Sequence, residues 1–134
     1  MGRYLLSIGS NCHCAAEMMA RAENWLRNHF DDVDSSGIYR TRAHNGRSAD
    51  YLNMVARGTS RLTAGEVAAL AKEFERQCGR TPQSKLTGCV EMDVDVIAAD
   101  NTILRPGEFT RAYFTEGFSR LEPAGAQRPE YISS

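Results

Sequence analysis

The sequence predicts an α+β fold in which two helices cover one face of an antiparallel sheet. Segments with the two-residue apolar period of strands and segments with the three- and four-residue period of helices follow one another along the chain. Their order is strand, helix, strand, strand, helix, strand, which is the ferredoxin-like βαββαβ arrangement. A chain of 134 residues is long enough to bury a core as one domain. We therefore expect one domain over residues 1–121, followed by a poorly ordered tail over residues 122–134.

The first half of the chain carries the first strand, the first helix and the strand pair. Residues 3–8 are almost continuously apolar and predict a buried strand. From Ala15 to Phe30, apolar residues recur at helical spacing, and the acidic residues 31–34 end that helix. Residues 36–41 predict the second strand. A polar loop over residues 42–49 leads to a third strand over residues 50–56.

The second helix begins at a capping box. Thr63 and Glu66 have the spacing at which the hydroxyl and the carboxylate satisfy each other's backbone amides. The helix runs to about Gly79, and a loop is expected over residues 81–89. The last strand follows at residues 92–96, while the pattern assigns no element to residues 103–121.

The strand at residues 92–96, MDVDV, is the most informative segment. Because strand side chains alternate between faces, Met92, Val94 and Val96 are expected to enter the core, and Asp93 and Asp95 to project together from the opposite, uncovered face. Two strand rises separate their Cβ atoms by about 6.5 Å. Such paired carboxylates can hold Mg²⁺, which in enzymes usually accompanies nucleotide phosphates. The alternative is a solvent-facing strand whose acidic residues discourage mispairing.

Composition excludes several classes of protein. A net charge of −1 argues against a domain built to bind nucleic acid, because such domains carry a basic excess. The chain has no run of eighteen apolar residues and no cationic leader, so we expect a cytoplasmic protein without a membrane partner. The four cysteines, including those of the Cys12-His13-Cys14 motif, are then expected to be reduced thiols. That motif lacks the second ligand pair of a structural zinc site.

Five short segments, in this order, resemble the 6-hydroxymethyl-7,8-dihydropterin pyrophosphokinase family of folate biosynthesis. They are IGSN at residues 8–11, IYRT at 38–41, DYLN at 50–53, ERQCGR at 75–80 and DVDV at 93–96. The resemblance spans roughly residues 3–121, and that family's fold is also ferredoxin-like. It implies a divergent member that is an ATP-dependent diphosphotransferase: it transfers a diphosphate from ATP to the hydroxymethyl group of a reduced pterin and releases AMP. Its partners would be these two small molecules, and we expect a monomer.

The resemblance also implies the residues of the nucleotide end. Asp93 and Asp95 match the aspartates that hold two magnesium ions on the ATP phosphates. With them, Arg80 and Lys85 would serve the reacting phosphates. The positions matched to nucleotide contacts are Glu75, Arg80, Arg111 and Val96.

The pterin end is implied in the same way. Asn53 matches a residue whose amide reads the donor and acceptor edge of the heterocycle, and Tyr113 falls where the family has a ring that stacks on it. The full set of positions matched to the pterin site is Thr41, Arg42, Tyr51, Asn53 and Tyr113.

The sequence departs from the family pattern mainly at the nucleotide end. The segment aligned with the family's Arg-Trp-Gly-Pro-Arg motif reads Leu-Thr-Gly-Cys-Val at residues 86–90, and Gly107 replaces a histidine. Lys85 is the remaining nearby cation, and a lysine lacks the bidentate fork of an arginine. Two alternatives therefore stay open: a relative that binds a pterin or nucleotide without catalysis, and a kinase-like enzyme with another substrate.

Overall fold

The computed structural model describes residues 1–42 and 49–121, without the side chains of Lys85 and Thr87. In this part of the chain one antiparallel sheet of six strands has the order β2-β4-β1-β5-β6, and β3 also pairs with β4. The strands are β1 (Gly2–Ser10), β2 (Asp31–Ser35), β3 (Tyr39–Thr41), β4 (Tyr51–Ser60), β5 (Asp93–Ala99) and β6 (Thr102–Ile103). The α+β class is thus confirmed, while the ferredoxin-like detail stays a prediction.

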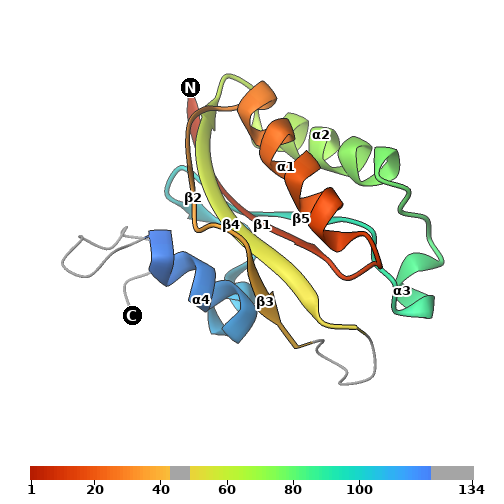
Figure 1. Ribbon diagram of the computed structural model, residues 1–134. Coiled ribbons are helices and arrows are strands. Elements are labelled where there is room, and N and C mark those ends of the chain that lie inside the picture. The colour runs from red at the N-terminus through yellow and green to blue at the C-terminus, as the bar shows by residue number, and fades with distance from the viewer. Residues whose placement is uncertain (43–48, 122–134) are drawn as a thin grey trace.

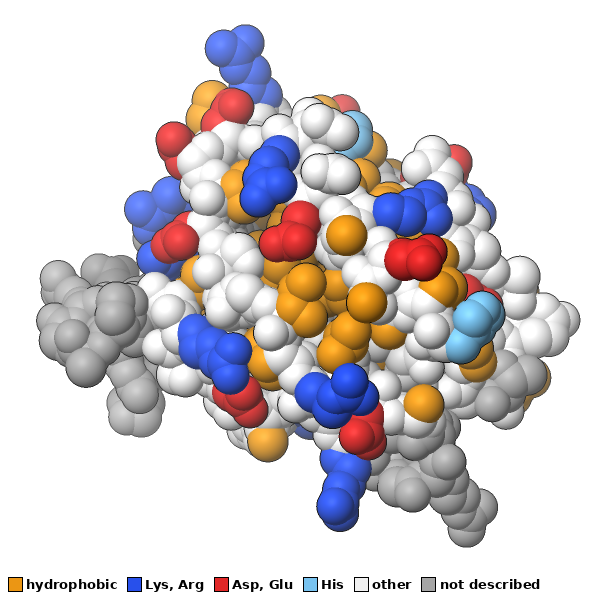
Figure 2. Space-filling model, viewed as in Figure 1, with side chains coloured by type: hydrophobic (Ala, Val, Ile, Leu, Met, Phe, Trp, Pro, Cys, Tyr) orange, Lys and Arg blue, Asp and Glu red, His pale blue; other side chains and the backbone are white. Residues whose placement is uncertain are grey.

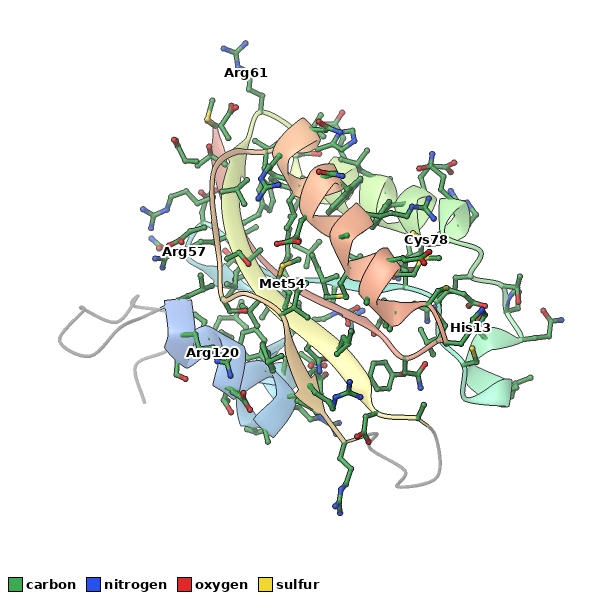
Figure 3. All side chains as sticks on the ribbon, in the orientation of Figure 1. His13, Met54, Arg57, Arg61, Cys78 and Arg120 are labelled. Atoms are coloured by element: carbon green, nitrogen blue, oxygen red, sulfur yellow. The ribbon has the colours of Figure 1, made fainter. Side chains whose placement is uncertain are left out.

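Helices α1 (Ala15–His29) and α2 (Ala64–Gln77) lie side by side across one face of the sheet (Figure 1). Trp25 of α1 stacks on Phe74 of α2, with ring centroids 4.9 Å apart. Beneath them the strands contribute an apolar layer that includes Met54 of β4, which Figure 3 labels at the centre of the molecule. As the alternation predicts, Met92, Val94 and Val96 belong to this core.

The capping box of α2 forms as the sequence predicts. The Glu66 backbone N–H donates to Thr63 Oγ1 at 3.2 Å, and the Thr63 N–H donates to Glu66 Oε1 at 2.9 Å. Two of the backbone N–H groups that a helix start leaves unpaired are satisfied in this way. The start of α2 is therefore encoded locally.

The second strand differs from the prediction. Helix α1 ends directly before residue 31, as predicted, but the mostly acidic residues 31–34 then form part of β2, and the expected strand over residues 36–41 is reduced to β3. Both strands pair with β4, and Asp34 of exposed β2 forms an ion pair with Arg57 of β4 at 3.1 Å. Acidic residues suit such an edge strand because they discourage pairing with another chain.

The loop expected at residues 81–89 contains a short helix, α3 (Ser84–Thr87). The Thr81 N–H donates to Ser84 Oγ at 3.0 Å, and Ser84 Oγ donates to Glu91 Oε1 at 2.7 Å. These hydrogen bonds are made by polar side chains. Apolar periodicity therefore does not reveal this short helix. The predicted loop residues 43–48 and the predicted tail over residues 122–134 lie outside the described part of the chain.

The second face of the sheet is not open as expected, because the segment left unassigned packs against part of it. This segment forms a 3-10 turn, η1 (Pro106–Thr110), and a helix, α4 (Ala112–Leu121). Phe114 and Phe118 of α4 pack on Leu5, Val55 and Ile97, forming a second and smaller core. Figure 1 shows α4 on the side of the sheet away from α1 and α2. A ligand could therefore bind this face only where α4 does not cover the strands.

The surface agrees with the small net charge. In the face drawn in Figure 2, basic and acidic side chains are interspersed around a central group of apolar ones. No extended basic area covers the described residues on this face, as a surface for a nucleic-acid backbone would require.

Candidate active site

The register of the three central strands brings the predicted polar residues into rows on the face that α4 partly covers. Gly9 of β1 lies opposite Asn53 of β4 on one side and opposite Asp93 of β5 on the other. Directly opposed residues project from the same face of a sheet. Asn53 and Asp93, 40 positions apart in sequence, therefore share a face with one glycine between them.

Because Gly9 has no side chain, it leaves space between the side chains of Asn53 and Asp93. A Cβ atom at this position would lie 3.1 Å from Asn53 Oδ1 and 3.4 Å from the Tyr51 ring. The next row along β1 has Ser7 opposite Asp95 and Val55. Small residues of β1 thus alternate with the apolar ones that face α1 and α2, and they form the bottom of a depression.

A cavity of about 740 Å³ occupies this depression, between the strands and the segment formed by η1 and α4. Its volume is in the range of pockets that hold small-molecule ligands. The residues that line it are Ser7, Gly9, Thr41, Arg42, Tyr51, Asn53, Asp93, Glu108, Thr110, Arg111, Ala112, Tyr113 and Glu116. Seven of the residues that the sequence singled out are among them, drawn from β3, β4, β5 and the region of α4.

Asp93 and Asp95 project from the same face of β5, as the sequence predicts. Asp95 lies in the row beside Ser7, and its side chain is only 15% exposed. Burial raises the pKa of Asp95 to about 6, with a further upward contribution from the charge of Asp93 and an opposing one from Arg105. Arg105 Nη2 lies 3.4 Å from Asp95 Oδ1. Two close carboxylates in a low-dielectric site favour a cation between them.

Arg80 and Glu75 support Asp93 from behind the strand. Arg80 Nη1 donates to Asp93 Oδ1 at 2.9 Å and to the Met92 carbonyl at 3.1 Å. Glu75, 4% exposed, accepts from the Val94 backbone N–H at 2.8 Å and lies 3.2 Å from Arg80 Nη1. The buried carboxylate of Glu75 thus holds the guanidinium of Arg80, which in turn orients the partly buried carboxylate of Asp93. Glu75 and Arg80 were both expected at the nucleotide, and both lie next to the start of β5, where Asp93 reaches the cavity.

Across Gly9 from Asp93, the β4 side of the cavity carries amide, hydroxyl and phenol groups. Asn53 is 5% exposed, and its Nδ2 donates to Thr41 Oγ1 at 2.5 Å. Thr41 is paired with Tyr51 across β3 and β4. Burial raises the pKa of the Tyr51 phenol, and the nearby Asp93 charge adds to this effect. The neutral phenol and the oriented amide are groups suited to a neutral heterocycle.

Tyr113 faces the same cavity from α4. Its hydroxyl donates to Glu108 Oε2, and its backbone carbonyl accepts from the Tyr39 hydroxyl. Burial and the bond to Glu108 raise the pKa of Tyr113 well above its usual range. The ring is therefore held as a neutral phenol between the sheet and η1.

Four of the predicted site residues do not line the cavity. Asp95, Arg80 and Glu75 lie beside or behind Asp93, and Val96 is buried in the core under α1 and α2. The side chain of Lys85 is outside the described part, and the roles of all of these residues stay predictions. Arg42 lines the cavity and is exposed.

Sequence reasoning missed several cavity residues. Ser7 lay in the strand expected to be buried over residues 3–8, and Gly9 in the break after it, although their small size at alternate positions is a usable signal. Glu108 and Glu116 belong to the segment that had been assigned no element. Only the packing of α4 on β4 and β5 brings these two carboxylates to the cavity.

The donor set fits magnesium delivered with a nucleotide. In the described residues no three His, Cys, Asp or Glu side chains are grouped so that they could enclose a metal by themselves. Mg²⁺ commonly takes only one or two protein carboxylates and completes its shell with water and substrate phosphates. Asp93 and Asp95 supply that number, from one face of one strand.

Comparison with protein families decides the assignment. The model of the 7,8-dihydro-6-hydroxymethylpterin-pyrophosphokinase family matches residues 5–123. The chain belongs to this family. Membership implies pyrophosphokinase activity in folate biosynthesis, with ATP as co-substrate, generally together with Mg²⁺, and binding of a pterin. A comparison with curated proteins found no match. Among the described helices of this pyrophosphokinase-family chain, none is long and apolar enough to cross a membrane.

Proposed function

We propose that this chain transfers a diphosphate group from ATP to the hydroxymethyl group of 6-hydroxymethyl-7,8-dihydropterin and releases AMP. The observation that carries the proposal is the arrangement of the cavity: Gly9 lies between Asp93 on one side and Asn53 on the other, and Tyr51 and Tyr113 line the same cavity. One cavity therefore offers a site for metal-bound phosphates beside a site for a flat heterocycle.

At the nucleotide end, the protein would position phosphates and balance their charge. Asp93 and Asp95 would hold Mg²⁺, which when bound would neutralise negative charge on the phosphates. Arg80, which donates to Asp93 Oδ1, would keep this carboxylate oriented toward the metal. Arg111 and Arg42 line the same cavity and would contribute further positive charge.

At the other end, the protein would read and stack the pterin. The carboxamide of Asn53, oriented by Thr41, presents both a donor and an acceptor, which match the mixed edge of a 2-amino-4-oxo ring. The rings of Tyr51 and Tyr113 would supply apolar faces. Both phenols are neutral at physiological pH, and the upward shift of their pKa values moves them further from ionisation.

The transfer itself is a substitution at the β-phosphorus. The hydroxyl oxygen of the pterin forms the new P–O bond, the bond from the β-phosphorus to the oxygen bound to the α-phosphorus breaks, and AMP leaves with that oxygen. The hydroxyl proton is released to solvent or buffer. Arg80 and Lys85, as predicted from the sequence, would offset charge near the reacting phosphates, so that positioning and electrostatics supply the catalysis.

An AMP-release assay tests this function. Purified protein is incubated with ATP, magnesium and hydroxymethyl-dihydropterin, next to the Asp95→Ala variant and to Asp31→Ala, which removes an exposed carboxylate on β2. We expect pterin-dependent AMP from the wild type and from Asp31→Ala, and none from Asp95→Ala. Equal AMP formation by all three proteins would contradict the assignment of Asp95 as a magnesium ligand.

The second candidate is a protein that binds the pterin or the nucleotide without transferring the diphosphate. It is favoured by the absence of arginine from residues 86–90. It is also favoured by the ion pairs of Arg80 with Glu75 and Asp93, because they already use the positive charge that would otherwise act on the phosphates. Calorimetric binding of the pterin in the presence of a magnesium–nucleotide analogue, with no AMP release at any magnesium concentration, would support this candidate. Turnover that disappears in Asp95→Ala would reject it.

A further inference from the structure

The residue that follows β1, Asn11, connects the ends of three strands through its side chain. Asn11 is 4% exposed. Its Nδ2 donates to the Gly88 carbonyl at 2.7 Å and to the Ala49 carbonyl at 3.3 Å, and its Oδ1 accepts from the Val90 N–H at 2.6 Å. Its own backbone N–H donates to the Val90 carbonyl at 3.0 Å. Figure 1 shows the turn after β1 meeting the chain that enters β5.

The three side-chain bonds use what a carboxamide offers. An asparagine provides two N–H donors and one carbonyl acceptor from a short side chain, whereas a carboxylate provides only acceptors. The ladder between β1 and β4 ends at Ser10 opposite Leu52, and the ladder between β1 and β5 ends at Gly9 opposite Asp93. Asn11 continues the connection of β1 to both neighbours beyond these last pairs.

The two segments that Asn11 joins lead directly into opposite walls of the cavity. Ala49 precedes Tyr51 by two residues, and Val90 precedes Asp93 by three. Tyr51 and Asp93 both line the cavity, with Gly9 on the floor. We propose that Asn11 is a positioning residue that sets the distance between the wall carrying Tyr51 and Asn53 and the wall carrying Asp93.

This role predicts an effect on catalysis, which rests on the function proposed above. It also predicts an effect on the order of the two segments that Asn11 joins, which is independent of that function. A transfer between two bound substrates depends on their relative placement, and an error of about 1 Å can cost about 100-fold in rate. Binding of either substrate alone does not require the two walls to be held at a fixed distance from each other. We call the three side-chain hydrogen bonds of Asn11 the clamp. Loss of the clamp should therefore reduce kcat more than it weakens the binary complex with either substrate.

Three variants separate positioning from stability. Asn11→Asp keeps the size and the acceptor but removes both donors, and Asn11→Ser removes all three side-chain bonds without adding charge. Val67→Ala is the control, because Val67 is fully buried in the core under the helices and does not line the cavity. Each protein is assayed below its melting temperature, with kcat from AMP release and with binary Kd values for the pterin and for a magnesium–nucleotide analogue.

We expect kcat to fall by at least about tenfold in both Asn11 variants, with each binary Kd changed by less than about threefold, in keeping with a loss of placement. Val67→Ala should lower the melting temperature and leave kcat near that of the wild type. Loss of kcat in Val67→Ala to the same extent, or a Kd change that accounts for the whole loss, would overturn the proposal.

Hydrogen exchange read by mass spectrometry tests the clamp independently of activity. Amides of residues 49–53 and 88–93 should both exchange faster in Asn11→Asp and Asn11→Ser, and not in Val67→Ala. Unchanged exchange in either segment would overturn the clamp. If the wild type releases no AMP, the proposed function fails, and the exchange result still decides whether Asn11 joins the two walls.

Discussion

The two faces of the sheet are built for different purposes. The face under α1 and α2 is filled by apolar side chains such as Trp25, Phe74 and Met54. The other face has an apolar part under α4 and a polar part, where Ser7, Gly9, Asn53 and Asp93 border the cavity. One face thus supplies most of the burial that holds the fold, and the other leaves room for a ligand beside a smaller core. We expect substitutions on the two faces to affect different properties.

The largest expected effect is on stability, at the helix-covered face. Trp25→Ala should lower the free energy of unfolding by about 3–5 kcal/mol, because it removes a large buried ring and leaves a cavity next to Phe74. Denaturant titration measures this change. Pterin binding below the midpoint should remain near that of the wild type, and a selective loss of binding in a fully folded variant would contradict the separation of the faces.

The next effect is on activity, at the cavity face. Asp93→Asn should reduce magnesium-dependent turnover by about 10²–10³, the cost of removing one preorganised electrostatic contact to a transition state. The amide oxygen can still accept from Arg80, so the melting temperature should stay close to that of the wild type. Asp31→Asn, on the exposed β2, serves as the control. Equal turnover in the two variants would remove Asp93 from the site.

The raised pKa of Asp95 predicts a pH dependence of stability without metal. The folded pKa is about 6, above the ordinary 3.8, so the folded state binds the proton more tightly than the unfolded state. Stability should therefore fall as the pH rises from about 4 to about 6, by up to about 3 kcal/mol at 1.36 kcal/mol per pKa unit. Thermal unfolding in a chelator measures this slope.

Two comparisons sharpen the pH prediction. Asp95→Asn should flatten the profile, because the group that titrates is gone. Added magnesium should weaken the slope in the wild type, since a bound cation stabilises the ionised carboxylate. Stability that rises between these pH values, or a profile that Asp95→Asn leaves unchanged, would show that ionisation of Asp95 does not destabilise the folded state.

A smaller effect is expected where α4 meets the sheet. A Cβ atom at Gly117 would lie 2.5 Å from Val55 Cγ2 and would also overlap Tyr39. Gly117→Ala should cost about 1–3 kcal/mol of stability by overpacking. Because α4 also carries Tyr113, displacement of the helix should weaken pterin binding, which calorimetry can measure. The exposed Gly65, near which a Cβ atom meets nothing within 4 Å, gives a control: Gly65→Ala should cause neither loss.

The smallest effect is expected from Tyr113→Phe. This change removes only the hydroxyl that donates to Glu108, a bond worth about 1 kcal/mol. The ring remains as a stacking surface, so pterin affinity should fall by less than about tenfold, because a tenfold loss requires about 1.4 kcal/mol. Tyr113→Ala should lose more, because it removes the ring. Similar affinities for the two variants would argue against a stacking role.

Sequence patterns determined the local features of this protein. Alternation in MDVDV is enough to place Asp93 and Asp95 together on one face, since strand geometry has a period of two. Thr63 and Glu66 are enough to begin α2, because a capping box involves only neighbouring residues. The same patterns did not separate β2 from β3, because an exposed acidic edge strand has little apolar signal.

The tertiary structure alone decided what meets across the sheet. Register places Gly9 between Asn53 and Asp93, and packing of α4 brings Tyr113 and Glu108 over that row. Local periodicity carries no information on register or on which face an extra helix covers, because both depend on contacts between residues far apart in the chain. The sequence by itself therefore supplied the chemical groups of the site, and long-range pairing and packing assembled them into one cavity.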